Sequence, residues 1–69
     1  MKFKIAFRFI GEREAIRNDV FVAGTIIEAS HRHGELWNSH FAFSDRFRSV
    51  LYRFETASRR WRRVETINW

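Results

Sequence analysis

The residues best suited to chemistry in this chain are arginines, and they gather in its C-terminal half. Between Ser44 and Arg63 there are seven arginines against two acids, a local charge of +5 that equals the net charge of the whole chain. A guanidinium is planar and presents donors in a fixed fork that suits phosphate. Such contacts give salt-dependent binding that tolerates many nucleotide sequences. If these arginines share one exposed surface, the segment predicts docking on nucleic acid or on an acidic protein surface.

One tryptophan stands inside the densest part of this arginine run. Trp61 is preceded by two arginines and followed by two more. Proteins that bind single strands combine such cations with rings on which bases stack. The alternative is that Trp61 belongs to a buried apolar stripe. The predicted binding residues are Arg46, Arg48, Arg53, Arg59, Arg60, Trp61, Arg62 and Arg63.

The histidines raise the question of a metal. His31, His33 and His40 lie near Glu35, and imidazole with carboxylate can ligate zinc. The spacing does not match the four-residue separation of catalytic zinc helices, so we predict a polar loop and neither a metal nor a cofactor. Ser39 beside His40 does not make a triad, and no paired carboxylates or glycine-rich phosphate loop stand out. The chain is therefore predicted not to be an enzyme.

One segment nevertheless resembles an enzyme family. Residues 47–54, with the sequence FRSVLYRF, resemble the arginine-and-tyrosine strand of RelE-type ribosome-dependent RNase toxins, which are also small and basic. The resemblance covers these eight residues. It implies that Arg48, Tyr52 and Arg53 contact the scissile phosphate and stabilise charge during metal-free RNA cleavage. We retain this as a minor alternative.

Two β-strands are expected in the first half of the chain. Residues 2–10 alternate, with Phe3, Ile5, Phe7 and Phe9 on one face and Lys4, Ala6 and Arg8 on the other, which is typical of a half-buried antiparallel strand. Gly11 is expected to end it. Residues 20–29 are rich in β-branched side chains and apolar on both faces, and they predict a central strand with a bulge at Gly24.

The C-terminal half admits two folds. An amphipathic helix over residues 44–63 would be capped by Ser44 and would end in arginines that suit the negative end of the helix dipole. Packed on the two strands, it makes an α+β domain, which is our main prediction. The alternative is a hairpin of residues 50–55 and 61–67 around a turn at residues 56–59, within an all-β, five-stranded, barrel-like domain.

Size and composition limit the classes of protein to consider. Sixty-nine residues without cysteine make a single domain (residues 1–69) whose core depends on aromatic side chains, and self-association as a homodimer would add buried area. No apolar run is long enough for a membrane span, and no signal-peptide core is evident, so we expect a cytoplasmic protein with no membrane partner. Eleven of the thirteen basic residues are arginine, for which the codon bias of a GC-rich genome is an alternative cause.

Two functional hypotheses stand ahead of the RelE-type alternative. The first is a small basic DNA-binding or RNA-binding protein that contacts phosphates through its arginine-rich C-terminal face. The second is a small inhibitor or adaptor, of the kind that phages and other mobile elements encode, which grips a host protein of a nucleic-acid complex. Aromatic and arginine side chains dominate protein interfaces, so Trp37, Trp61 and an exposed Trp69 would serve the second role as well.

Overall fold

A computed structural model describes residues 1–40 and 45–67 of the chain. Within these residues the chain forms four strands and one helix. Their bounds are Lys2–Phe9 for β1, Arg17–Val22 for β2, Ile26–His40 for α1, Phe47–Glu55 for β3 and Arg60–Ile67 for β4. Ser44 and Trp69, for which the sequence predicts a helix cap and an exposed contact, lie outside the described residues.

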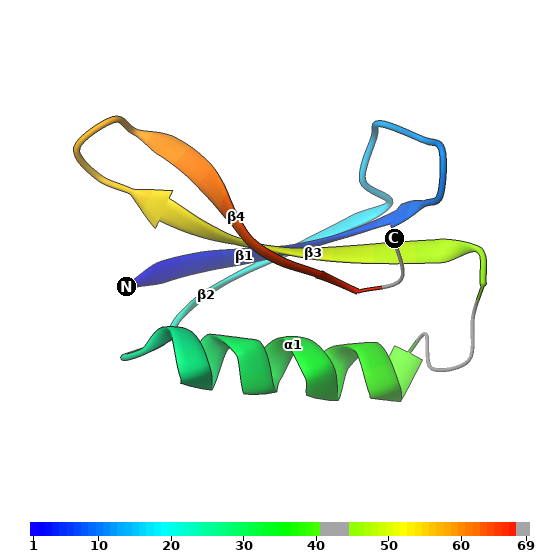
Figure 1. Cartoon of the computed structure of the whole chain (residues 1–69), viewed down its shortest axis with the longest axis horizontal. Helices are drawn as coiled ribbons and strands as arrows, with labels where there is room; N and C mark the ends of the chain where they lie inside the picture. Colours follow the sequence, from blue (N-terminus) through cyan, green and yellow to red (C-terminus); the bar gives the residue numbers. More distant parts are fainter. Residues whose placement is uncertain (41–44, 68–69) are drawn as a thin grey trace.

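The strands form one antiparallel sheet in the order β2, β1, β3, β4. Helix α1 crosses one side of this sheet, and no described helix crosses the other (Figure 1). We call these two sides the covered face and the open face. The predicted α+β class is confirmed. The five-stranded barrel is wrong, because the sheet has four strands and ends at β2 and β4.

Strand β1 has the alternation that the sequence predicts. Phe3, Ile5 and Phe7 are fully buried on the covered face, and the residues between them point to the open face. Gly11 follows the strand with a φ of +90°, a conformation that side chains with a Cβ rarely adopt. The chain can therefore turn back at once and pair β2 with β1.

The strand predicted over residues 20–29 is correct only in its first part. Strand β2 ends at Val22 and is an end strand of the sheet, and residues from Ile26 onward are helical. The Thr25 Oγ1 accepts a hydrogen bond from the Glu28 amide at 3.1 Å, and the Glu28 carboxylate accepts one from the Gly24 amide at 2.9 Å. These bonds satisfy backbone donors at the helix start, which favours a helix despite the β-branched residues.

The helix predicted over residues 44–63 is wrong, and the alternative hairpin is what the chain forms. Strands β3 and β4 pair around residues 56–59, where Arg59 has a φ of 54°. Strand β3 lies inside the sheet, so consecutive residues on both of its faces are buried: Ser49 at 0%, Val50 at 4% and Leu51 at 0% exposure. An apolar run without alternation cannot be distinguished from a helix by its periodicity.

The core lies between the covered face and α1. Ala29, His33 and Trp37 stand four residues apart, which puts them on one side of the helix, and all three are buried. The Phe3 and Phe21 rings stack at 5.7 Å between centroids. The buried apolar residues of this cluster are Phe3, Ile5, Phe7, Phe21, Ala29, Trp37 and Leu51. This packing holds α1 on the covered face and leaves the open face exposed.

Candidate nucleic-acid interface

The eight residues predicted as a binding site do not form one surface. Arg48 lies opposite Arg8 on the open face, whereas Arg53 lies opposite Phe3 on the covered face. The hairpin register assigns Arg48, Trp61 and Arg63 to the open face and Arg53, Arg60 and Arg62 to the covered face, while Arg46 and Arg59 lie outside the strands. Successive side chains of a strand point to opposite faces of the sheet. The arginine run is therefore divided between the two faces.

On the covered face, one arginine is already neutralised by the chain itself. The Arg62 Nε donates to a carboxylate oxygen of Glu55, and the Ser58 hydroxyl donates to the other oxygen at 2.8 Å. The hydrogen bond from Arg62, followed by the one from Ser58, holds the pKa of the Glu55 carboxyl below its usual value. Arg62 is therefore less available to an external anion than the open-face arginines.

The open face interleaves aromatic rings with cations. The Phe54 and Trp61 rings meet edge to face, with 5.2 Å between centroids. The Lys2 ammonium lies 5.2 Å from the Phe54 centroid, and the Lys4 ammonium lies 4.6 Å from Trp61 and 5.1 Å from Tyr52. These are cation–π distances, so the two lysines lie over the rings. Aromatic rings and cations are the two kinds of group that single-strand-binding proteins combine.

Sequence reasoning missed the contribution of β1 to this surface. Lys4 and Arg8 were expected on the polar face of a strand, but not as part of a site with the C-terminal residues. The pairing of β1 with β3 sets Lys4 opposite Tyr52 and Arg8 opposite Arg48. Alternation alone gave the face of each residue. The missing information was which distant strand lies beside β1.

Tyr52 contacts two cations of β1 on the open face. Its hydroxyl accepts a hydrogen bond from Arg8 Nη2 at 3.2 Å, and its ring lies beneath Lys4. Of the three residues that the RelE-type resemblance implies, Arg48 and Tyr52 share this face and Arg53 does not. The structure therefore brings together only two of the three residues that the resemblance implies.

Acidic residues of the described strands all stand on the covered face. Asp19 lies opposite Ile5, Glu65 opposite Leu51, and Glu55 opposite Arg60. By the same register, the strand cations of the open face are Lys2, Lys4, Arg8, Arg48 and Arg63. No carboxylate within the described strands therefore competes with an anion for this surface.

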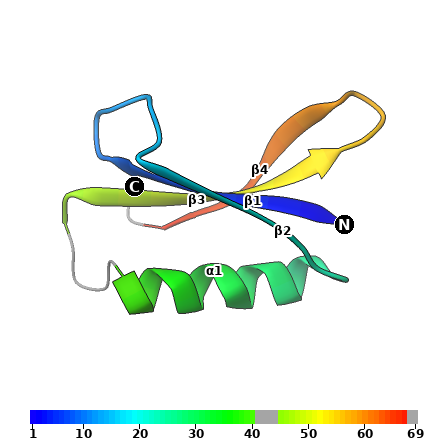
Figure 2. The ribbon, with the colours of Figure 1, turned by 180° about the vertical axis from the view of Figure 1, so that it is seen from behind.

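The open face is bordered by raised hairpin ends. The loop between β1 and β2 and the turn between β3 and β4 both rise from the sheet on the side opposite α1, and the view from behind agrees (Figures 1 and 2). Between them, Ala6 and Val50 form a cross-strand pair that is only 2% and 4% exposed. A groove lined by Arg60, Trp61, Arg62 and Arg63 continues around the β4 edge. Neighbouring side chains therefore cover the middle of this face, and the basic and aromatic residues lie around it.

Beneath the helix lies a buried polar network that the sequence did not predict. His33 is fully buried, with Nδ1 2.8 Å from Glu65 Oε1 and Nε2 2.6 Å from Ser49 Oγ. The Ser30 hydroxyl donates to both Glu65 oxygens at 2.9 and 3.0 Å. Because an ionised carboxylate only accepts, Nδ1 carries a proton, and the Ser49 hydroxyl donates to Nε2 when the ring is neutral.

Ser49, His33 and Glu65 have the connectivity of a serine–histidine–acid triad. The Ser49 side chain is 0% exposed under α1, however, so a substrate carbonyl cannot reach its Oγ. A nucleophile must meet its substrate within hydrogen-bonding range. In this structure the network ties the helix to β3 and β4, and it serves packing.

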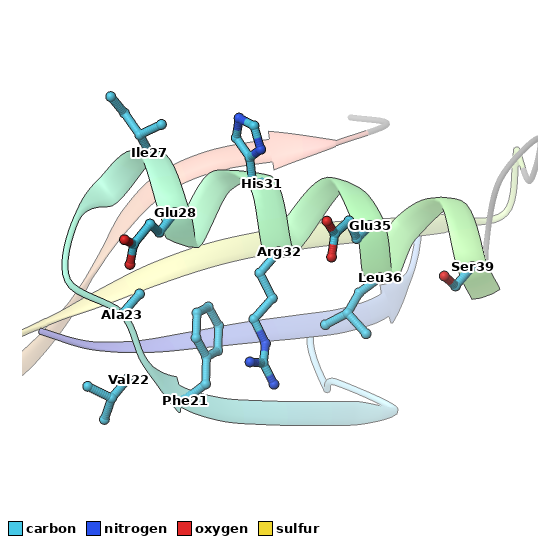
Figure 3. A pocket seen from close by; sticks show the side chains of 10 residues that line it. All are labelled: Phe21, Val22, Ala23, Ile27, Glu28, His31, Arg32, Glu35, Leu36 and Ser39. Atoms are coloured by element: carbon cyan, nitrogen blue, oxygen red, sulfur yellow. The ribbon is translucent and has the colours of Figure 1, made fainter.

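A second depression lies between β2 and α1, away from the open face. In Figure 3 the Arg32 side chain reaches from the helix toward Phe21, and its guanidinium carbon is 4.6 Å from the ring centroid. His31 and Glu35 also line this groove, whereas His33 points into the core. Within the described residues, no three metal-ligating side chains gather in one place. The histidines thus occupy different environments, and the His40 side chain lies outside the described set.

Comparison of the chain with protein-family models, with curated proteins and with solved structures found no match. Over the described residues, α1 is the only helix, and it is too short and too polar to cross a membrane.

Proposed function

We propose that this chain is a non-enzymatic binding protein whose open face holds single-stranded nucleic acid. Bases stack on Tyr52, Phe54 and Trp61, and the neighbouring lysines and arginines pair with phosphates. The observation that supports this most directly is the interleaving of three rings with cations, on a face where the described strands carry no carboxylate. The arginine-rich C-terminal segment contributes through Arg48, Trp61 and Arg63, the three of its eight predicted residues that lie on this face.

A single strand suits this face better than a duplex, because the bases of a duplex are already stacked on one another. Base stacking on a protein ring needs an unstacked base, and four-stranded sheets with exposed aromatics bind RNA in this way. Stacking tolerates every base, since each has a π-face, so we expect little sequence preference. A strand lying across β1, β3 and β4 would pass all three rings and the five cations of this face.

A salt titration with matched arginine variants tests the proposal. Arg48→Ala with Arg63→Ala removes two charges from the open face, one each from β3 and β4. Arg53→Ala with Arg60→Ala removes two charges from the same strands on the covered face. We expect the first pair to reduce the slope of log affinity against log salt by about 0.7 per lost contact on a single strand, and the second pair to leave it nearly unchanged. Equal losses in both pairs would contradict the proposal.

A protein partner is the second candidate, favoured by exposed aliphatic residues near the β2 edge of the sheet. Val22 is 78% and Ile27 71% exposed, and both line the groove between β2 and α1. Apolar residues gathered at a groove are typical of contact surfaces. A pull-down with and without nuclease separates the candidates: partners that survive digestion indicate a protein contact of the adaptor or inhibitor kind.

A further inference from the structure

Two arginines of the open face stand directly opposite each other. Arg8 of β1 and Arg48 of β3 are cross-strand partners, and like charges in this position repel. Both Nε atoms are buried, and neither has a hydrogen-bond partner among the described residues. Buried donors of this kind are normally paired. The pair therefore has unused donors and unbalanced charge at the same place.

The surroundings fix one of the two side chains. Arg8 donates from Nη1 to the Arg13 carbonyl oxygen at 3.2 Å and from Nη2 to the Tyr52 hydroxyl at 3.2 Å. Because the Tyr52 oxygen accepts this bond, its own proton is free to be donated to a third group. Glu12 and Glu14 lie in the exposed loop after β1, and neither forms an ion pair with Arg8 or Arg48 in the described part of the chain. Two cations and a hydroxyl donor thus lie together without an ion-pair partner in the described part of the chain.

The charge of this cluster selects among phosphates. An internal phosphodiester carries one negative charge, whereas a phosphomonoester carries about −1.5 to −2 at neutral pH and has three acceptor oxygens. Two guanidinium groups balance the charge of a phosphomonoester better than that of a phosphodiester. The planar donor groups of arginine also match the oxygens of a phosphomonoester. The cluster also lies at one end of the row of rings: Arg8 is four residues along β1 from Lys4, about 13 Å in a strand.

We propose that Arg8, Arg48 and Tyr52 form a site for the terminal phosphomonoester of a nucleic-acid strand whose bases stack toward Phe54 and Trp61. This inference depends on the proposed function and adds to it that the protein recognises a phosphorylated strand end. The end is a 5′ or a 3′ phosphate, which share this chemistry. The rings then hold the nucleotides next to that end.

The test compares three forms of one single-stranded oligonucleotide of about eight nucleotides, a length within the usual site size. One form carries a 5′ phosphate, one a 3′ phosphate, and one has hydroxyls at both ends. We expect one phosphorylated form to bind about tenfold more tightly than the hydroxyl form, a difference of about 1.4 kcal/mol. Which form gains identifies the end that the site takes.

Variants separate this inference from the proposed function. Arg48→Gln should abolish the preference while the hydroxyl form still binds, and Arg53→Gln, on the same strand but the other face, should preserve the preference. Tyr52→Phe keeps the ring and removes only the hydroxyl, so it should weaken the preference without loss of stacking. Equal binding of all three forms by the natural protein overturns the inference and leaves the proposed function standing. Absence of binding to every form overturns both.

Discussion

The two faces of the sheet are built from the same strands and carry opposite kinds of surface. On the covered face, each carboxylate has a partner within the chain: Asp19 with Arg17, Glu65 with His33, and Glu55 with Arg62. On the open face, the cations meet aromatic rings or one another. The net charge of +5 is therefore unevenly distributed, and the sheet presents most of its uncompensated positive charge to one side.

This difference shows how a period of two separates functions along a single strand. Leu51 is part of the core, and its neighbour Tyr52 is part of the proposed binding surface. The bulge between these residues shifts the register of β4 and lets Val64 reach the core while Arg63 stays opposite Tyr52. Alternation together with this bulge thus divides the side chains of the hairpin between the two faces.

The largest effect is expected on the covered face, from His33→Ala. The substitution leaves Ser49 and Glu65 without their shared partner and opens a cavity under α1. A buried polar group that loses its partner costs about 1–3 kcal/mol, so we expect the free energy of unfolding to fall by about 2–4 kcal/mol. Denaturant titration followed by circular dichroism measures this fall.

His31→Ala is the matched control, because His31 is exposed on the same helix two residues away. It should change the free energy of unfolding by less than about 0.5 kcal/mol. If the two variants are equally stable, the buried network does not hold α1 to the sheet, and the covered face loses its main polar contact.

On the open face, the expected effect is on affinity. Trp61→Ala removes a ring that contacts Phe54 and carries the Lys4 ammonium. Loss of one stacked base costs about 1–3 kcal/mol, which is about tenfold or more in the dissociation constant for a single strand. Trp61→Phe retains a ring and should recover most of the affinity, as measured by fluorescence anisotropy of a labelled oligonucleotide. Undiminished binding by Trp61→Ala would remove the aromatic half of the proposed site.

The sequence predicts the fold class and β1 correctly, and it fails where tertiary context decides. The pair Thr25 and Glu28 has the spacing of a capping box and would have indicated the start of α1, but the β-branched residues around it favoured a strand. The helix predicted in the C-terminal half is wrong because the apolar residues of β3 do not alternate with polar ones. They do not alternate because β3 lies inside the sheet and is buried on both faces.

The candidate site was predictable in kind but not in position. The arginine run and Trp61 indicate an anionic, stackable partner, and three of the eight predicted residues do share the open face. The other cations of the candidate site, Lys2, Lys4 and Arg8, come from the opposite end of the chain. Nothing local in the sequence reveals that they lie beside β3, because the pairing of β1 with β3 spans more than half of the chain.

The smallest expected effect concerns the pair that neutralises Arg62. The hydrogen bonds from Arg62 and Ser58 lower the pKa of Glu55 in the folded state below its ordinary value of 4.5. Glu55 therefore contributes stability that is fully present above pH 4.5 and is lost as the pH falls through the lowered pKa of the folded state. Denaturant titrations should show the natural protein slightly more stable than Glu55→Gln at neutral pH, with the difference shrinking below pH 4.5. A difference that stays constant with pH would mean that the pair does not form.

The same variant compares the two faces as binding surfaces. Glu55→Gln frees the Arg62 guanidinium on the covered face and leaves the open face unchanged. If single strands bind at the open face, their affinity should change only slightly, by the weak long-range attraction that remains over a Debye length of about 10 Å at 0.1 M salt. A large gain in affinity would instead show that the covered-face arginines contact the nucleic acid, and the division between the faces would then not govern binding.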